Sequence, residues 1–168
     1  SVPYTAASIA DKDLVFGWPS LRQILQQMPY PYVISNLTID GKNPWPTHDY
    51  LIREVNGVKI GLFALLDPKP VNSTHRLTGM RATDPVAAAK EMSERLKEKG
   101  VQIVILLSSV GSPEKEGISD STIAEEAPNI DLILSSNMDR ENAETDKINK
   151  TLIVYPGSKL DSLARVRL

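Results

Sequence analysis

Residues 101–107 (VQIVILL) form an almost wholly apolar run that directly follows a helix signal. A strand with apolar residues at nearly every position is typical of burial on both faces of a sheet. Ahead of this run, Asp84-Pro85 supplies an N-cap and a first-turn proline, and Gly100 supplies a helix stop. A helix that leads into a doubly buried strand predicts an α/β protein.

The other segments extend this alternation. Asn56-Gly57 lies between two β-rich runs and is the strongest short-range signal for a hairpin with a type I′ turn. Together these patterns predict an α/β fold with a mixed sheet, in a single domain over residues 1–168. The expected strands are residues 4–9, 30–37, 50–55, 58–66, 101–107, 130–134, 152–155 and 163–168, the expected helices are 17–27, 84–99 and 119–127, and residues 67–83 are expected to be a long polar connection.

Each of the two longer helices is expected to bury one apolar stripe. The predicted stripes are Leu21, Ile24 and Leu25 in the first helix, and Val86, Ala89, Met92 and Leu96 in the second.

Composition excludes several classes of function. The net charge of −2 gives no electrostatic case for binding a nucleic acid polymer, and no apolar run approaches the roughly 20 residues that span a bilayer. The absence of cysteine excludes disulfides and thiolate metal sites. Three glycosylation sequons, at Asn36, Asn72 and Asn149, are interpreted as chance matches.

Three segments end expected strands at the edge of the sheet where α/β proteins bind their ligands. They are residues 10–13, 107–111 and 135–139, and none of them contains a histidine. Both histidines of the chain, His48 and His75, fall in expected loops without a ligand partner at close spacing.

Six segments, in order and spacing, resemble the C-terminal half of the metallophosphoesterase domain of the 5′-nucleotidase and 2′,3′-cyclic phosphodiesterase family, which has a calcineurin-like fold. The resemblance covers nearly the whole chain and implies a mixed-sheet sandwich of the metallophosphoesterase type whose N-terminal half is absent. The segments are residues 4–17 (YTAASIADKDLVFG), 32–37, 52–66 (with EVNGVKIG), 84–111, 128–139 and 155–168.

Active proteins of this family use two metal ions that bind a phosphate and the attacking water. Carried over by position, Asp11 replaces an asparagine ligand and Lys12 replaces the histidine that helps to protonate the leaving group. Ser109, Asn137 and Asp139 replace ligand histidines, and the D-x-H and G-D motifs would lie upstream of Ser1. Serine and neutral asparagine are poor ligands for Zn, Mn or Fe, so the resemblance predicts neither catalysis nor a cofactor.

Other interpretations stay open at these positions. Asp11, Asn137 and Asp139 are weak candidates for one Mg²⁺ or Ca²⁺ ion, although loop-end polar residues more often cap helices and turns. Lys12 is a candidate anion ligand, against the simpler alternatives of a solvated lysine or an ion pair with Asp13.

Three functions follow from the resemblance. The first is a non-catalytic 5′-nucleotidase-like domain that serves as a structural or interaction subunit of a larger assembly. The second is an active metal-dependent phosphoesterase whose other half comes from another chain or an upstream segment, and the third is an anion- or nucleotide-binding module without chemistry. The first function requires another protein chain over the missing half of the sandwich, and family analogy suggests a periplasmic or extracellular location.

Overall fold

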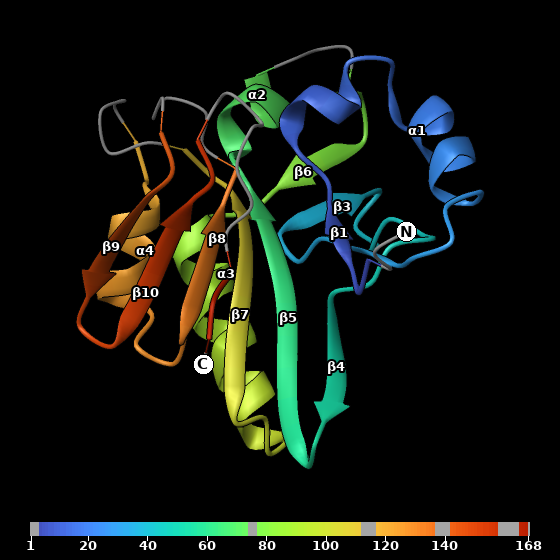
Figure 1. The fold of residues 1–168 in the computed structure, drawn as a ribbon. Coiled ribbons are helices and arrows are strands. Elements are labelled where there is room, and N and C mark those ends of the chain that lie inside the picture. The colour runs from blue at the N-terminus through green and yellow to red at the C-terminus, as the bar shows by residue number, and fades with distance from the viewer. Residues whose placement is uncertain (1–3, 74–76, 112–116, 137–141, 158–164, 168) are drawn as a thin grey trace.

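A computed structural model describes residues 4–73, 77–111, 117–136, 142–157 and 165–167. A six-stranded mixed sheet forms its centre (Figure 1). The strands are β4 (Tyr50–Val55), β5 (Val58–Leu66), β7 (Ile103–Ser109), β8 (Leu132–Ser135), β9 (Glu144–Ile148) and β10 (Thr151–Tyr155). They are hydrogen-bonded in the order β4-β5-β7-β8-β10-β9, in which the four central strands are parallel and both edge strands are antiparallel.

The predicted hairpin and the predicted capped helix are both confirmed. Asn56 and Gly57 have φ values of 51° and 79°, the left-handed geometry that a type I′ turn needs at both central positions. Helix α3 (Pro85–Glu98) begins after Asp84, whose carboxylate accepts a hydrogen bond from the Ala87 amide at 2.8 Å. The local sequence therefore sets the turn between β4 and β5 and the start of α3.

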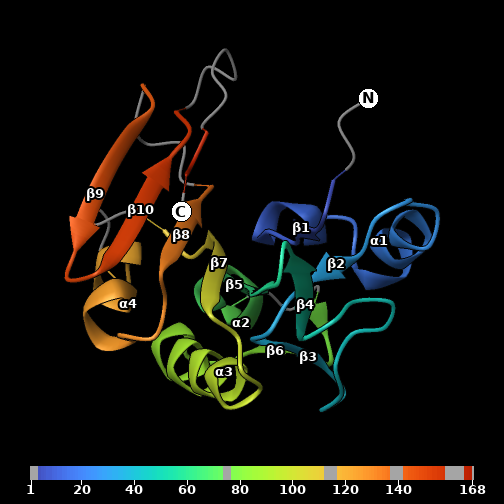
Figure 2. The same cartoon turned by 60° about the horizontal axis from the view of Figure 1, so that its bottom comes forward.

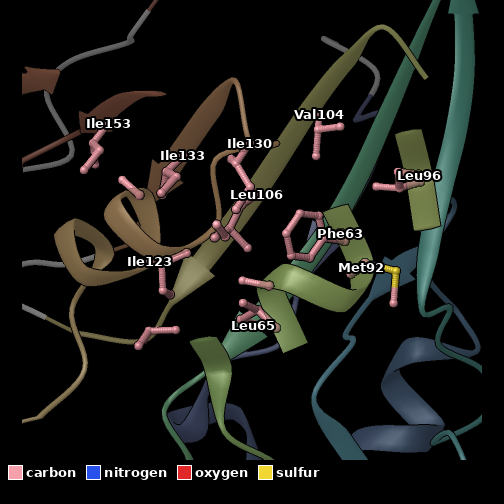
Figure 3. Packing of buried hydrophobic residues seen from close by; sticks show 14 of the residues in the cluster. Phe63, Leu65, Met92, Leu96, Val104, Leu106, Ile123, Ile130, Ile133 and Ile153 are labelled. Carbon is pink, nitrogen blue, oxygen red and sulfur yellow. The ribbon is translucent and has the colours of Figure 1, made fainter. Parts of the chain in front are cut away.

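Helices α3 and α4 (Asp120–Glu126) cover one face of the sheet. Figure 3 shows Phe63 and Leu106 of the sheet packed among residues of both helices, including Leu96 and Ile123. The predicted α3 stripe is confirmed, with Ala89, Met92 and Leu96 buried and Val86 partly buried. Burial of this face supplies the main core of the molecule.

The second face of the sheet differs from the prediction of two-sided burial. Along β7, fully buried residues alternate with half-buried ones, because α3 and α4 pack against the first face only. In the neighbouring parallel strands the alternation is incomplete, since Ala64, Leu66, Leu132 and Val154 of the second face are buried. The half-buried apolar residues of this face are Ile60, Leu62, Ile103, Ile105, Leu107, Leu134 and Leu152.

A smaller layer covers part of that second face, over β4, β5 and β7. It consists of β1 (Ala7–Ser8), the 3₁₀ helix η1 (Asp11–Leu14), α1 (Trp18–Leu25) and β2 (Tyr32–Val33). Strand β1 pairs in parallel with β2, and a small cluster that includes Val33, Ala64 and Leu107 joins this layer to the sheet. Figures 1 and 2 show β1, β2 and α1 grouped beside β4 and β5, away from β9 and β10.

The predicted α1 stripe is partly wrong. Leu21 and Leu25 are buried, but Ile24 is 52% exposed. The helix is only two turns long and packs through its i, i+4 pair, so Ile24 lies beside the contact rather than in it.

Two further predictions are wrong in the same region. Residues 30–37 do not form one strand but divide into β2 and β3 (Leu37–Ile39), and residues 67–83 are not an unstructured connection but contain α2 (Pro68–Ser73) and β6 (Met80–Ala82). The buried Asn36 side chain causes the division, because it binds the Leu66 amide and carbonyl and the Thr83 carbonyl. In residues 67–83, the Asn72 amide pairs with both backbone groups of Ala82 and holds α2 against β6.

At the C-terminal end, β10 is confirmed and β9 was not predicted. Strand β9 is polar, with three charged residues among its five and no apolar run, so its pairing with β10 carries no hydrophobic signal. The last predicted strand, 163–168, is not found in its described part, since residues 165–167 are irregular, and its other residues lie outside the described ranges. No helix in the described ranges is long and apolar enough to cross a membrane.

We expect Asn36→Leu to lower the free energy of unfolding by about 3 kcal/mol, because it leaves buried backbone groups of Leu66 and Thr83 without their side-chain partner. Urea unfolding measures the loss. Thr38→Ala is the control, since its hydroxyl makes an exposed hydrogen bond, and we expect a change within about 0.5 kcal/mol. Equal losses in both variants would contradict this role of Asn36.

Candidate functional site

The carboxyl ends of β5, β7 and β8 meet at one edge of the sheet, because the three strands are parallel and in register. Successive residues of a strand point to opposite faces. At the ends of β7 and β8, Ser108 and Ser135 therefore face the helices, and Ser109 and Ser136 face the other side. Four serines at one edge form two pairs on opposite faces.

Ser109 and Ser136 form the outer pair. The Ser136 hydroxyl donates to the Ser109 hydroxyl at 3.0 Å, and the Ser109 carbonyl accepts from the Asp67 amide at 3.1 Å. Ser109 is half-buried and Ser136 is exposed. Neutral hydroxyls bonded to each other thus occupy the position where the resemblance places a ligand histidine.

Asp11 and Lys12 belong to η1, which follows β1 and lies at the same end of the molecule as α2 and the end of β5 (Figure 1). The Lys12 side chain is exposed, and the structure gives it no ion pair with Asp13. Asp13 instead accepts a hydrogen bond from the Ala10 amide at 2.9 Å, which caps the start of η1. Of the two simpler alternatives for Lys12, a solvated lysine and an ion pair with Asp13, the structure agrees with the solvated lysine.

The remaining sequence candidates are separated from these residues or lie outside the described ranges. Asn137, Asp139 and His75 lie outside them. His48 is exposed, and its backbone pairs with β2 in a parallel bridge. The structure therefore joins Ser109 to Ser136, which the sequence did not single out, but gives no hydrogen bond between Ser109 and the described residues of η1.

A buried carboxyl, Asp120, lies under the inner serine pair and was missed by the sequence reasoning. Its side chain is 0% exposed, the Ser108 hydroxyl donates to its Oδ1 atom, and Ser135 also interacts with the carboxyl. Burial raises the pKa of Asp120, and the two serines oppose that rise only in part. The sequence signal was Ser119-Asp120 at a helix start, which indicates a cap and gives no sign of burial.

The donor set does not fit a transition-metal centre. Within the described ranges, no three His, Asp or Glu side chains lie close enough together to hold a metal ion. The described carried-over positions supply one half-buried carboxylate (Asp11), one exposed ammonium (Lys12) and one hydroxyl (Ser109). Imidazoles and several carboxylates are the ligands that Zn and Mn require at such centres.

Comparisons with known proteins agree with the fold that the resemblance implies. No family model matches the chain. A NAD 5′-nucleotidase of Haemophilus influenzae is 29% identical over 126 residues, which are 72% of this chain and 20% of that protein. The solved structure of Haemophilus influenzae NAD nucleotidase has a TM-score of 0.73 at 22% identity, covering 89% of this chain and 33% of the other.

A calcineurin-like phosphoesterase of Bacillus subtilis has a TM-score of 0.68 at 23% identity, over 79% of this chain and 44% of the other. The sequence and structure neighbours of this chain are thus 5′-nucleotidases and calcineurin-like phosphoesterases, and its mixed sheet matches part of the calcineurin-like fold. The chain spans one fifth to less than half of the length of these proteins.

We expect Asp120→Asn to become more stable relative to the unsubstituted chain as pH rises. The raised pKa of Asp120 means that its contribution to stability is fully present below the ordinary pKa of aspartate and is lost as pH rises through the folded value. Asparagine keeps the shape without the buried charge. Urea unfolding at pH 4.5, 6 and 8 measures the difference between the two proteins.

The control is Glu125→Gln, which removes an exposed carboxylate from the same helix. The stability difference of Asp120→Asn should change with pH by more than that of this control. A difference for Asp120→Asn that is constant would contradict a buried, hard-to-ionise carboxyl.

Proposed function

We propose that this chain is a non-catalytic 5′-nucleotidase-like domain that acts as a structural or interaction subunit of a larger assembly. The observation that carries the proposal is the hydroxyl pair of Ser109 and Ser136 at the strand ends, in place of a metal-ligating histidine. Asp11 and Lys12 also stand where the family resemblance places an asparagine ligand and a histidine.

The chemistry of these groups argues against a two-metal hydrolase. A neutral serine hydroxyl is a weak donor to a borderline metal ion, and a lysine ammonium repels a cation. Lys12 is exposed, so its charge keeps its hydration at no cost to the fold. Ser109 and Lys12 are compatible with a stable fold, but they are poor neighbours for two metal cations. We accordingly propose that the chain has no metal cofactor.

The second face of the sheet supports an assembly role. Leu62, Ile105 and Leu152 on this face are half-buried, although Leu132 between the last two is buried. A sheet rich in apolar residues on both faces needs cover on both. We propose that another polypeptide completes the sandwich there.

We also propose a periplasmic or extracellular location and no nucleic acid polymer as a partner. The location rests on family analogy and on the likeness to a solved structure described as a 5′-nucleotidase precursor from Thermus thermophilus. The second part follows from the net charge of −2.

The alternative is an active metal-dependent phosphoesterase whose other half is supplied from elsewhere. It is favoured by the partial coverage of the solved neighbours, of which this chain matches 33% and 44% in the two structures compared. In that case Asp11 and the residues after Ser136 must bind metal together with ligands from the other half.

Hydrolysis and metal binding distinguish the two functions. We expect the protein, isolated with whatever assembly it forms, to show no metal-dependent hydrolysis of bis-p-nitrophenyl phosphate or AMP. We also expect no saturable heat of binding for Mn²⁺, Zn²⁺, Mg²⁺ or Ca²⁺. An authentic NAD 5′-nucleotidase is the positive control, and metal-dependent turnover that Ser109→Ala abolishes would establish the alternative.

A further inference from the structure

A hollow of about 460 Å³ lies where three segments of the small layer meet. They are the end of α1, residues 28–31 that lead into β2, and residues 45–46 in the connection from β3 to β4. None of the four serines at the strand ends lines this hollow, and its volume is within the usual range of ligand pockets. Rings make up most of the lining, which contains the aromatic residues Tyr30, Tyr32 and Trp45 and the prolines Pro29, Pro31 and Pro46.

The aromatic rings are available for contact. Trp45 is 58% exposed, although the Arg22 guanidinium lies 4.7 Å from the centre of its ring. The Tyr30 ring contacts the rings of Tyr4 and Tyr32, with centroids 5.1 and 5.6 Å apart. Exposed rings that gather at one hollow mark an interaction surface, whereas single scattered ones do not.

The polar groups among these rings are mainly hydrogen-bond donors. The Trp45 indole N–H can only donate, and Gln26 adds an amide that donates as well as accepts. Tyr30 and Tyr32 interact through their hydroxyls, which leaves one hydroxyl hydrogen of the pair for a ligand. Burial, and secondly the Tyr30 hydroxyl, raise the pKa of Tyr32 to about 12, so this hydroxyl stays protonated at neutral pH. Among the described residues, no acidic side chain lines the hollow.

The charge next to the Trp45 ring is positive. Arg22 is exposed, and within the described ranges its guanidinium contacts this ring and forms no ion pair. Asp13, which also influences Tyr32, lines a different hollow and caps η1. A positive charge at this place repels the quaternary ammonium ligands that aromatic sites often bind, and it attracts a carboxylate.

A proline-rich chain has the complementary chemistry. Proline has no N–H, and the polyproline II conformation contains no internal hydrogen bonds, so such a chain presents carbonyl acceptors and few donors. Its rings repeat at every third residue along one face, and aromatic-lined grooves bind this preformed conformation at a low cost in entropy. The donors, the rings and the charge of the hollow all match a ligand of this kind.

We propose that this hollow binds a proline-rich segment of another polypeptide in the polyproline II conformation, with an acidic residue of that segment beside Arg22. The proposal rests on the assembly role proposed above and names one kind of partner for it. Proline rings pack against Tyr30, Tyr32 and Trp45, and the Trp45 indole and a tyrosine hydroxyl donate to carbonyl groups of the segment.

Nuclear magnetic resonance titration of the protein, isolated with whatever assembly it forms, tests this contact. The probe is a synthetic peptide with P-x-x-P spacing followed by glutamate, and the control is the same peptide with serine in place of every proline. We expect the proline peptide alone to shift the Trp45 indole signal and the Tyr30 and Tyr32 amide signals, with saturation. The indole signal of Trp18, the other tryptophan, is the internal reference and should not move.

Two substitutions test the mode of binding. Trp45→Ala should weaken binding of the proline peptide by about tenfold, because it removes an aromatic contact and a donor. Its matched control is Phe16→Ala, which removes an 84% exposed ring that lines a different hollow and should leave the affinity unchanged. Arg22→Gln should weaken binding of the glutamate peptide by about threefold and leave binding of a glutamine peptide unchanged.

Circular dichroism melting checks that each variant is folded, and if Trp45→Ala is not, the Arg22→Gln comparison decides alone. The proposal would be overturned by no saturable binding of the proline peptide, by equal binding of the serine peptide, or by affinities unchanged in Trp45→Ala and Arg22→Gln. Shifts of the same signals by AMP but not by the proline peptide would also overturn it. Metal-dependent turnover, by contrast, would refute the non-catalytic role and leave the peptide result unaffected.

Discussion

Burial of one face of the six-stranded sheet under α3 and α4 is the constraint on which the remaining structure depends. It holds the parallel strands together, because Phe63, Leu106 and Ile133 of adjacent strands pack side by side in the core under both helices. With the strands paired in register, the ends of β7 and β8 come level, and each presents one serine inward and one outward. The inner pair meets Asp120, and the outer pair forms the edge where the family chemistry would take place.

The same constraint leaves the second face incompletely covered. The small layer of β1 and β2 occupies the part over β4, β5 and β7. This partly covered face lies on the side of the sheet away from α3 and α4. We have proposed that another polypeptide completes the sandwich on this side and that the strand ends do not catalyse hydrolysis.

Features with a strong local cause were predictable from the sequence. Asp84 and Gly100 bound α3 as expected, and Asn56-Gly57 makes the expected turn, because caps and tight turns depend on a few neighbouring residues. The division of β2 from β3 was not predictable, because it depends on contacts of Asn36 with residues 30 to 47 positions away. Strand β9 was missed since its stability comes from its partner rather than from apolar content.

The candidate site also has one feature that the sequence predicts and one that it does not. Its serine edge could be located from three apolar runs and their order, whereas the depth of Asp120 could not, because burial of a carboxyl is a property of the packed helix.

The central claim is that the strand ends cannot hold a two-metal centre. Anomalous diffraction from crystals soaked in Mn²⁺ and in Zn²⁺ tests it most directly. We predict no anomalous peak beside Ser109 or Asp11, and two neighbouring peaks there would contradict the account.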